Sequence, residues 1–276
     1  MPGPSFVARV RGFSLTLVAC LAAGSASAAK VSNVSLDGTD LKLHLTDGTT
    51  LSGPSLTGAI LTVADGRGAM LRVRIDGAQR DPVGNSKRWL YDLRAQGASG
   101  RWKQFCGEGP DGLQLGFPVA GRMTADGSFE PSEETLTISC TGGAVAKCIR
   151  FGYAPWETAG DGTPLLDHFR ACIRMVRADY CGNGQPHTRD GTLINIYDRL
   201  HIQVSEPSDD LHFEAAWGPD GAVCVRKTRL NDVWSLDQLR ESCGEKLDHR
   251  IGGDCSEATA VALPGALILN DSGFAD

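Results

Sequence analysis

The sequence lacks a hydrophobic run long enough to cross a lipid bilayer. A membrane-spanning helix needs roughly 20 consecutive apolar residues. The longest apolar stretch, from Phe13 to Ala23, is about half that length. We therefore expect no transmembrane segment.

Basic clusters are also missing. The chain has 27 lysine and arginine residues against 33 acidic residues, and its formal net charge is −6. Nucleic-acid binding depends mainly on lysine and arginine side chains that neutralise phosphates. Without a basic run or stripe, we expect no nucleic acid among the partners.

Familiar catalytic signatures are absent as well. The sequence contains no G-x-S-x-G, H-E-x-x-H or C-x-x-C motif, no EF-hand loop and no G-x-G-x-x-G between a strand and a helix. These absences remove the usual support for a serine hydrolase, a zinc hydrolase, a thioredoxin-like protein and a nucleotide-binding protein. We predict no cofactor and no metal, and we favour a protein that is not an enzyme.

The N-terminus does contain the parts of a secretory signal. Arg9 and Arg11 precede the apolar run, and Ala26-Ser27-Ala28 forms an A-x-A cleavage pattern. Residues 1–28 are therefore predicted to be a signal peptide. A second interpretation stays open, because Leu17-Val18-Ala19-Cys20 is similar to the lipobox of bacterial lipoproteins. Lipidation at Cys20 is the one route by which we expect membrane attachment.

Eight cysteines remain once Cys20 is set aside. In an oxidising compartment an even set is read first as disulfides, and the wide spacing does not suit zinc. The candidates for disulfide bonding are Cys106, Cys140, Cys148, Cys172, Cys181, Cys224, Cys243 and Cys255.

The residues after the signal divide into two regions. Residues 29–96 contain strand-like alternation, as in Leu41–Leu45 and Leu71–Ile75, and no cysteine. Residues 97–276 contain all eight remaining cysteines. We predict an α+β fold that is mostly β, with a strand-rich N-terminal part followed by a disulfide-stabilised domain with one main helix.

Several elements of the cysteine-rich region can be predicted. Residues 136–140 and 146–151 flank Thr141-Gly142-Gly143 as two strands joined by a turn, which would bring Cys140 close to Cys148. Apolar residues from Pro164 to Val176 recur at helical spacing, and a bridge from Cys172 to Cys181 would fix the end of that helix. Residues 211–217 and 222–225 predict a hairpin, and residues 235–242 predict a short amphipathic helix.

A set of spaced motifs resembles the bacterial ADYC domain. The motifs are Lys147-Cys148, Gly152-Tyr153, Pro155-Trp156, His168, Cys172, the run from Arg177 to Gly182, and the run from His187 to Thr192. Ala178-Asp179-Tyr180-Cys181 is the tetrapeptide that gives the family its name. The resemblance covers about residues 102–225 and implies an exported, cysteine-rich domain, but it supplies no catalytic residues.

Weak candidates for a site lie after the predicted main helix. Asp179, His187 and Asp190 can be read as a base with its carboxylates, or as ligands of a hard cation. They can also stabilise turns. This structural interpretation is favoured, because the alternating oxygen ligands of a calcium loop are missing.

Aromatic residues give a second weak candidate. Tyr153 and Trp156, with Tyr180 and Trp217, can line a groove for peptide or glycan, although such rings more often pack in the core. The leading hypothesis is an exported, non-enzymatic module that binds an unidentified extracellular or cell-surface partner. The alternative is a secreted hydrolase or metal-binding enzyme with a site around Asp179, His187 and Asp190.

Overall fold

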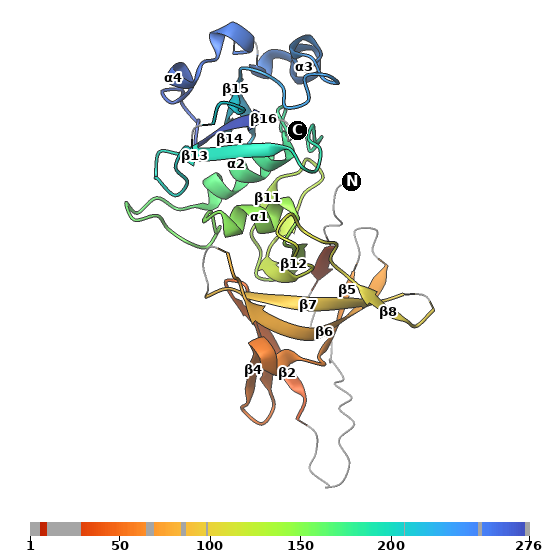
Figure 1. Ribbon diagram of the computed structural model, residues 1–276. Coiled ribbons are helices and arrows are strands. Elements are labelled where there is room, and N and C mark those ends of the chain that lie inside the picture. Colours follow the sequence, from red (N-terminus) through yellow and green to blue (C-terminus); the bar gives the residue numbers. More distant parts are fainter. Residues whose placement is uncertain are drawn as a thin grey trace. The chain divides into compact units, whose positions relative to one another are not determined.

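The computed structural model describes residues 6–9, 29–64, 69–83, 87–97, 99–206, 208–247 and 250–273 (Figure 1). The chain forms two compact units. The first, here called the barrel unit, comprises residues 2–122 and 131–146. The second, called the C-terminal unit, comprises residues 123–130 and 147–276. The predicted boundary near residue 97 lies inside the barrel unit, and most of the predicted signal peptide lies outside the described residues.

A seven-stranded sheet closes on itself in the barrel unit. Its strands follow the order β6-β5-β1-β12-β9-β7-β8, and β6 also pairs with β7. The strands are β1 (Phe6–Arg9), β5 (Ile60–Ala64), β6 (Met70–Arg80), β7 (Trp89–Gln96), β8 (Trp102–Gln104), β9 (Gly116–Ala120) and β12 (Thr135–Cys140). In β6, Val73 and Ile75 are buried while Arg72 and Arg74 alternate with them. This alternation confirms the predicted strand at Leu71–Ile75.

A small three-stranded sheet completes the barrel unit. It contains β2 (Val31–Asp37), β3 (Asp40–Leu45) and β4 (Thr50–Ser52), and it is followed by the 3-10 helix η1 (Gly53–Leu56). The predicted strand at Leu41–Leu45 is therefore confirmed. Tyr91 of β7 ties the two sheets together, because its hydroxyl accepts a hydrogen bond of 3.1 Å from the Leu41 amide.

The C-terminal unit is built on a four-stranded sheet of order β13-β16-β14-β15. The strands are β13 (Leu193–Asp198), β14 (His212–Gly218), β15 (Gly221–Val225) and β16 (Ile268–Gly273). The main helix, α2 (Leu166–Arg177), packs against β14, β15 and β16, and Figure 1 draws α2 and α4 (Glu257–Ala260) on opposite sides of the sheet. The predicted helix and the predicted hairpin are both confirmed.

Short elements surround this sheet. They are α3 (Leu236–Cys243), η2 (Gly244–Leu247), η3 (Gly252–Asp254) and the strands β10 (Arg122–Met123) and β11 (Phe129–Glu130). Helix α3 confirms the predicted helix at residues 235–242, and Ser235 caps it by accepting a hydrogen bond from the Gln238 amide. Among the described residues, no helix combines the length and the apolar character needed to cross a membrane.

One predicted strand is wrong. Residues 146–151 were expected as the second strand of a hairpin, but the chain forms helix α1 (Ala144–Arg150) there. Val145, Cys148 and Ile149 recur at helical spacing and are buried together. The side chain of Ser139 also supports the first turn, because its hydroxyl accepts a hydrogen bond of 3.1 Å from the Ala146 amide.

All eight candidate cysteines form disulfides. The pairs are Cys106–Cys140, Cys148–Cys172, Cys181–Cys243 and Cys224–Cys255. The expected bridge from Cys172 to Cys181 is therefore wrong, and Cys140 and Cys148, which were expected to lie close together, pair with other cysteines. Because residues 144–150 are helical, Cys148 faces helix α2 and pairs with Cys172. Cys181 is left to pair with Cys243, which is 62 residues further along the chain.

Candidate functional site at the end of helix α2

Helix α2 ends at a left-handed residue that starts the Ala178–Cys181 turn. Ala178 has φ 49° and ψ 43°, and its amide donates to the carbonyls of Arg174 and Met175. This ending matches the usual left-handed termination of helices, although glycine normally occupies the position. Ala178 is fully buried, so a small side chain is needed at this point.

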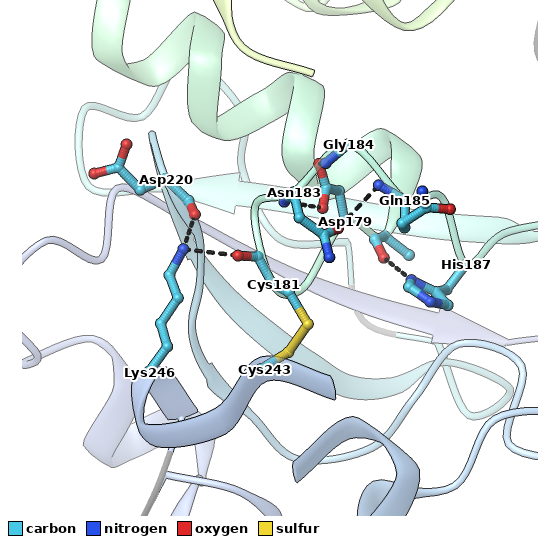
Figure 2. Close-up of a disulfide and its surroundings, with 10 residues drawn as sticks. Asp179, Cys181, Asn183, Gly184, Gln185, His187, Asp220, Cys243 and Lys246 are labelled. Atoms are coloured by element: carbon cyan, nitrogen blue, oxygen red, sulfur yellow. Dashed lines mark hydrogen bonds between the residues drawn. A yellow bond between two sulfur atoms is a disulfide. The ribbon is translucent and has the colours of Figure 1, made fainter. Parts of the chain in front are cut away.

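Asp179 holds the loop that follows the helix. Its carboxylate accepts a hydrogen bond from Arg174 Nη1 at 2.6 Å. It also accepts hydrogen bonds from the Asn183 amide at 3.1 Å and from the Gly184 amide at 2.9 Å (Figure 2). The residue is 0% exposed. Both carboxylate oxygens are thus occupied by donors of the protein and neither faces solvent.

Tyr180 reaches a buried polar network beneath the helix. Its hydroxyl donates to Glu214 Oε1 at 2.9 Å and accepts from the Arg229 amide at 2.7 Å. The Arg229 guanidinium makes a two-pronged contact with Glu214, from Nε at 2.9 Å and from Nη2 at 3.0 Å. Asn270 Nδ2 also donates to Glu214 at 2.9 Å, and Trp217 Nε1 donates to Asn270 Oδ1 at 2.7 Å.

Charge and burial oppose each other in this network. Burial raises the pKa of Glu214, but the adjacent Arg229 charge and its hydrogen bonds outweigh that effect, so the pKa lies below its ordinary value. Burial likewise raises the pKa of the Tyr180 hydroxyl well above its ordinary value. Glu214 is therefore held ionised and Tyr180 is held protonated, as the hydrogen-bond directions require.

Cys181 attaches the same turn to helix α3. Beside its disulfide with Cys243, the Lys246 ammonium donates to the Cys181 carbonyl at 2.9 Å and to the Asp220 carbonyl (Figure 2). Burial lowers the pKa of Lys246. The next residue, Gly182, has φ +67°, and a Cβ there would overlap the Asp220 carbonyl. Glycine is required because the β14–β15 turn approaches so closely.

His187 contacts the backbone and two aromatic rings. Its Nδ1 lies 3.1 Å from the Ala178 carbonyl, and its half-buried ring packs against Tyr180 and Trp234 with centroid distances of 5.9 and 4.5 Å. Asp190 is exposed on the following turn. Within residues 179–190, which the structure describes completely, no hydrogen bond joins His187 to Asp179 or Asp190.

The ADYC domain model matches residues 53–231, which is more than half of the chain. The chain belongs to the ADYC domain family. The match begins in the barrel unit, earlier than the likeness expected from about residue 102. It ends before Cys243, Cys255 and β16, although β16 pairs with two strands inside the matched region. No curated protein and no solved structure matches the chain.

The predicted aromatic groove of this ADYC protein is mostly buried. Tyr153, Tyr180 and Trp217 are each 0% exposed, and the Tyr153 hydroxyl donates to Asp198 Oδ2 at 2.6 Å. Trp156 is 41% exposed. Of the four rings, only Trp156 therefore presents a substantial surface to a ligand in this conformation.

A metal site requires several ligand side chains that lie close together. Across the described residues, no group of three or more histidine, cysteine, aspartate or glutamate side chains is placed to hold a metal ion. A separate hollow of about 320 Å³ is lined by Ser205, Ser208, Leu211, His212, Phe213, Glu257 and Asp271. None of the residues predicted from the sequence lines this hollow.

Sequence reasoning missed the residues that Tyr180 contacts. Glu214 and Arg229 lie 34 and 49 residues beyond Tyr180, and Asn270 is further still. One local signal was present: Glu214 stands in the otherwise apolar strand Phe213–Trp217, where an acidic residue needs a buried partner. The identity of that partner has no local signal.

Proposed function

We propose that this ADYC protein is exported and acts as a non-enzymatic module that binds an extracellular or cell-surface partner. The observation that carries the proposal is the use of the polar side chains at the name-giving motif. Asp179 is fully buried with three donors from the protein, and Tyr180 is committed to Glu214 and Arg229. Both side chains are fully buried and hydrogen-bonded within the protein, so neither faces a solvent-accessible substrate.

Export is supported by the cysteines. All eight that follow the predicted signal are paired, and such pairing persists in oxidising compartments outside the cytosol. The A-x-A pattern at Ala26–Ala28 supplies the cleavage point. Cleavage before Cys20 would instead give a lipid-anchored form of the same module.

The test is an intact mass of the exported product after alkylation without reduction, together with its metal content. We expect a chain that starts at Ala29, with no alkylated cysteine and no stoichiometric metal. A lipid-modified chain that starts at Cys20 would replace free secretion with anchoring. A stoichiometric metal that is lost in the His187→Ala variant, while that variant stays folded, would overturn the non-enzymatic proposal.

A further inference from the structure

Strand β1 closes the ring of strands in the barrel unit. It pairs antiparallel with β12 through Phe6↔Ile138, Val7↔Thr137, Ala8↔Leu136 and Arg9↔Thr135, and with β5 through Val7↔Ala64. Among the described strands, β5 and β12 pair with each other nowhere. The ring is therefore continuous only while a strand occupies the position between them.

That strand lies in the segment whose removal the proposed export requires. Residues 6–9 precede the A-x-A pattern, so cleavage after Ala28 removes β1 and leaves β5 through β12 in place. This inference thus rests on the proposed export. The mature chain would retain β12 paired with β9 on one edge, through five residue pairs, and unpaired on the other edge.

The freed edge of β12 has few of the features that protect exposed edges. Residues Thr135–Cys140 contain no proline and no charge, and they are rich in β-branched side chains. Natural proteins usually protect an exposed edge with lysine, proline or a bulge, or cover it with another segment. An edge of this composition is suited to pairing with a further strand.

We propose that the opening between β5 and β12 binds an extended segment of a partner protein, which adds to β12 as an antiparallel strand. Main-chain hydrogen bonds supply affinity in this mode of recognition, and alternate side chains supply specificity. Thr137 and Ile138 point to opposite faces of β12 and are 1% and 4% exposed. The partner residues opposite them therefore have to be apolar on both faces.

The end of the opening adds a charge preference. Glu133 and Glu134 immediately precede β12, and both are exposed. A segment antiparallel to β12 runs toward them with its C-terminal end, at the register position that Arg9 takes opposite Thr135. The geometry thus favours apolar residues opposite Ile138 and Thr137 and a cation opposite Thr135, toward the C-terminal end of the partner segment.

The experiment uses the exported product and a labelled, end-blocked peptide of residues 4–11, with fluorescence anisotropy as the readout. A peptide carrying Ala8→Pro is the matched control, because Ala8 pairs with Leu136, whose backbone faces this position, and proline removes that ladder donor. We expect saturable binding of the first peptide. The affinity for the second peptide should be at least about tenfold lower. An Ala28→Phe variant that keeps residues 1–28 should bind the peptide weakly, since its own strand fills the opening.

Equal binding of the two peptides, or no binding by a product that starts at Ala29, would overturn the proposed binding between β5 and β12. Either result would leave the proposed export intact. A product that retains residues 1–28 in the mass spectrum would overturn both proposals, because the position would never be vacated. A product that dimerises and in which the Leu136 and Ile138 amides, which face the vacated position, are already protected from hydrogen exchange would assign the opening to a second copy and overturn the partner segment.

Discussion

The barrel unit encloses aliphatic side chains such as Val73, Ile75 and Leu93, each at most 2% exposed, and it contains one disulfide. The C-terminal unit buries the ion pair of Glu214 and Arg229, and it contains three disulfides. Aliphatic burial tolerates many sequences of similar volume. A buried ion pair requires each partner in place, because either charge alone is costly.

The Ala178–Cys181 motif joins several elements of the C-terminal unit. Asp179 joins the end of helix α2 to the loop at residues 183–184, and Tyr180 joins the same turn to Glu214 of β14. Cys181 adds a covalent contact to the same turn. The name-giving residues are therefore the junction of the helix, the sheet and the C-terminal segment.

Removal of the Cys181–Cys243 disulfide should lower the free energy of unfolding more than any other change proposed here. In the chain-entropy account, a bridge over a separation of 62 residues stabilises the fold by about 4 kcal/mol. A Cys181→Ala, Cys243→Ala variant should lose about that much in chemical denaturation. The matched Cys106→Ala, Cys140→Ala variant removes a bridge over a separation of 34 residues. Its loss of unfolding free energy should be about 0.5 kcal/mol smaller. A motif disulfide that costs clearly less than the barrel disulfide would contradict this ranking.

Neutralising Glu214 should have the next largest effect and lower the free energy of unfolding by about 3 kcal/mol. The Glu214→Gln variant leaves the Arg229 charge buried without its counter-ion, and buried charges without partners are strongly destabilising. The exposed Glu206→Gln variant is the control and should change the unfolding free energy by less than about 0.5 kcal/mol. A Glu214→Leu, Arg229→Met variant removes both charges and should recover part of the loss. Equal effects of the two single variants would refute the role of the ion pair.

A smaller effect concerns the pH dependence of the C-terminal unit. Burial lowers the pKa of His168 despite the opposing charges of Asp198 and Asp167. The folded protein therefore binds its proton less readily than the unfolded chain does, where the pKa is about 6.5. Stability from this group is fully present above about pH 6.5 and is lost as pH falls toward the lower folded pKa.

The measurement is the unfolding free energy at pH 7 and pH 5.5 for the wild type and for His168→Phe. The variant keeps a ring beside Tyr153, whose ring is stacked on His168, and it should show a shallower decline. His212→Gln changes an exposed histidine and should leave the decline as it is. A decline that is identical in all three proteins would assign the pH dependence to other groups.

Periodicity predicted much of this fold. The strands at 41–45 and 71–75, the main helix, the β14–β15 hairpin and helix α3 all follow from local alternation or helical spacing. The prediction for residues 146–151 was wrong because a short apolar run fits both the strand period and the helix period. In the folded chain these residues form a helix, from which Cys148 bonds to Cys172. The cysteine pairing spans 24 to 62 residues and leaves no local trace.

The candidate site was predictable only as a location. Asp179 and His187 could be picked out as polar residues after a helix, but the contacts that define their roles form only in the folded chain. Asp179 receives a guanidinium from inside the helix, and the His187 ring packs against Trp234, 47 residues away. Nothing in the local pattern distinguishes such contacts from a catalytic pair.

Asp179 tests the structural role of the motif most directly. The measurement is the unfolding free energy of Asp179→Asn beside that of Asp190→Asn, which alters an exposed carboxylate of the same segment. The structural account predicts a loss of about 2–3 kcal/mol for Asp179→Asn, because Arg174 loses its buried counter-ion, and a change below about 0.5 kcal/mol for Asp190→Asn. An Asp179→Asn protein as stable as the wild type, or more stable, would contradict the account and return Asp179 to the candidates for chemistry.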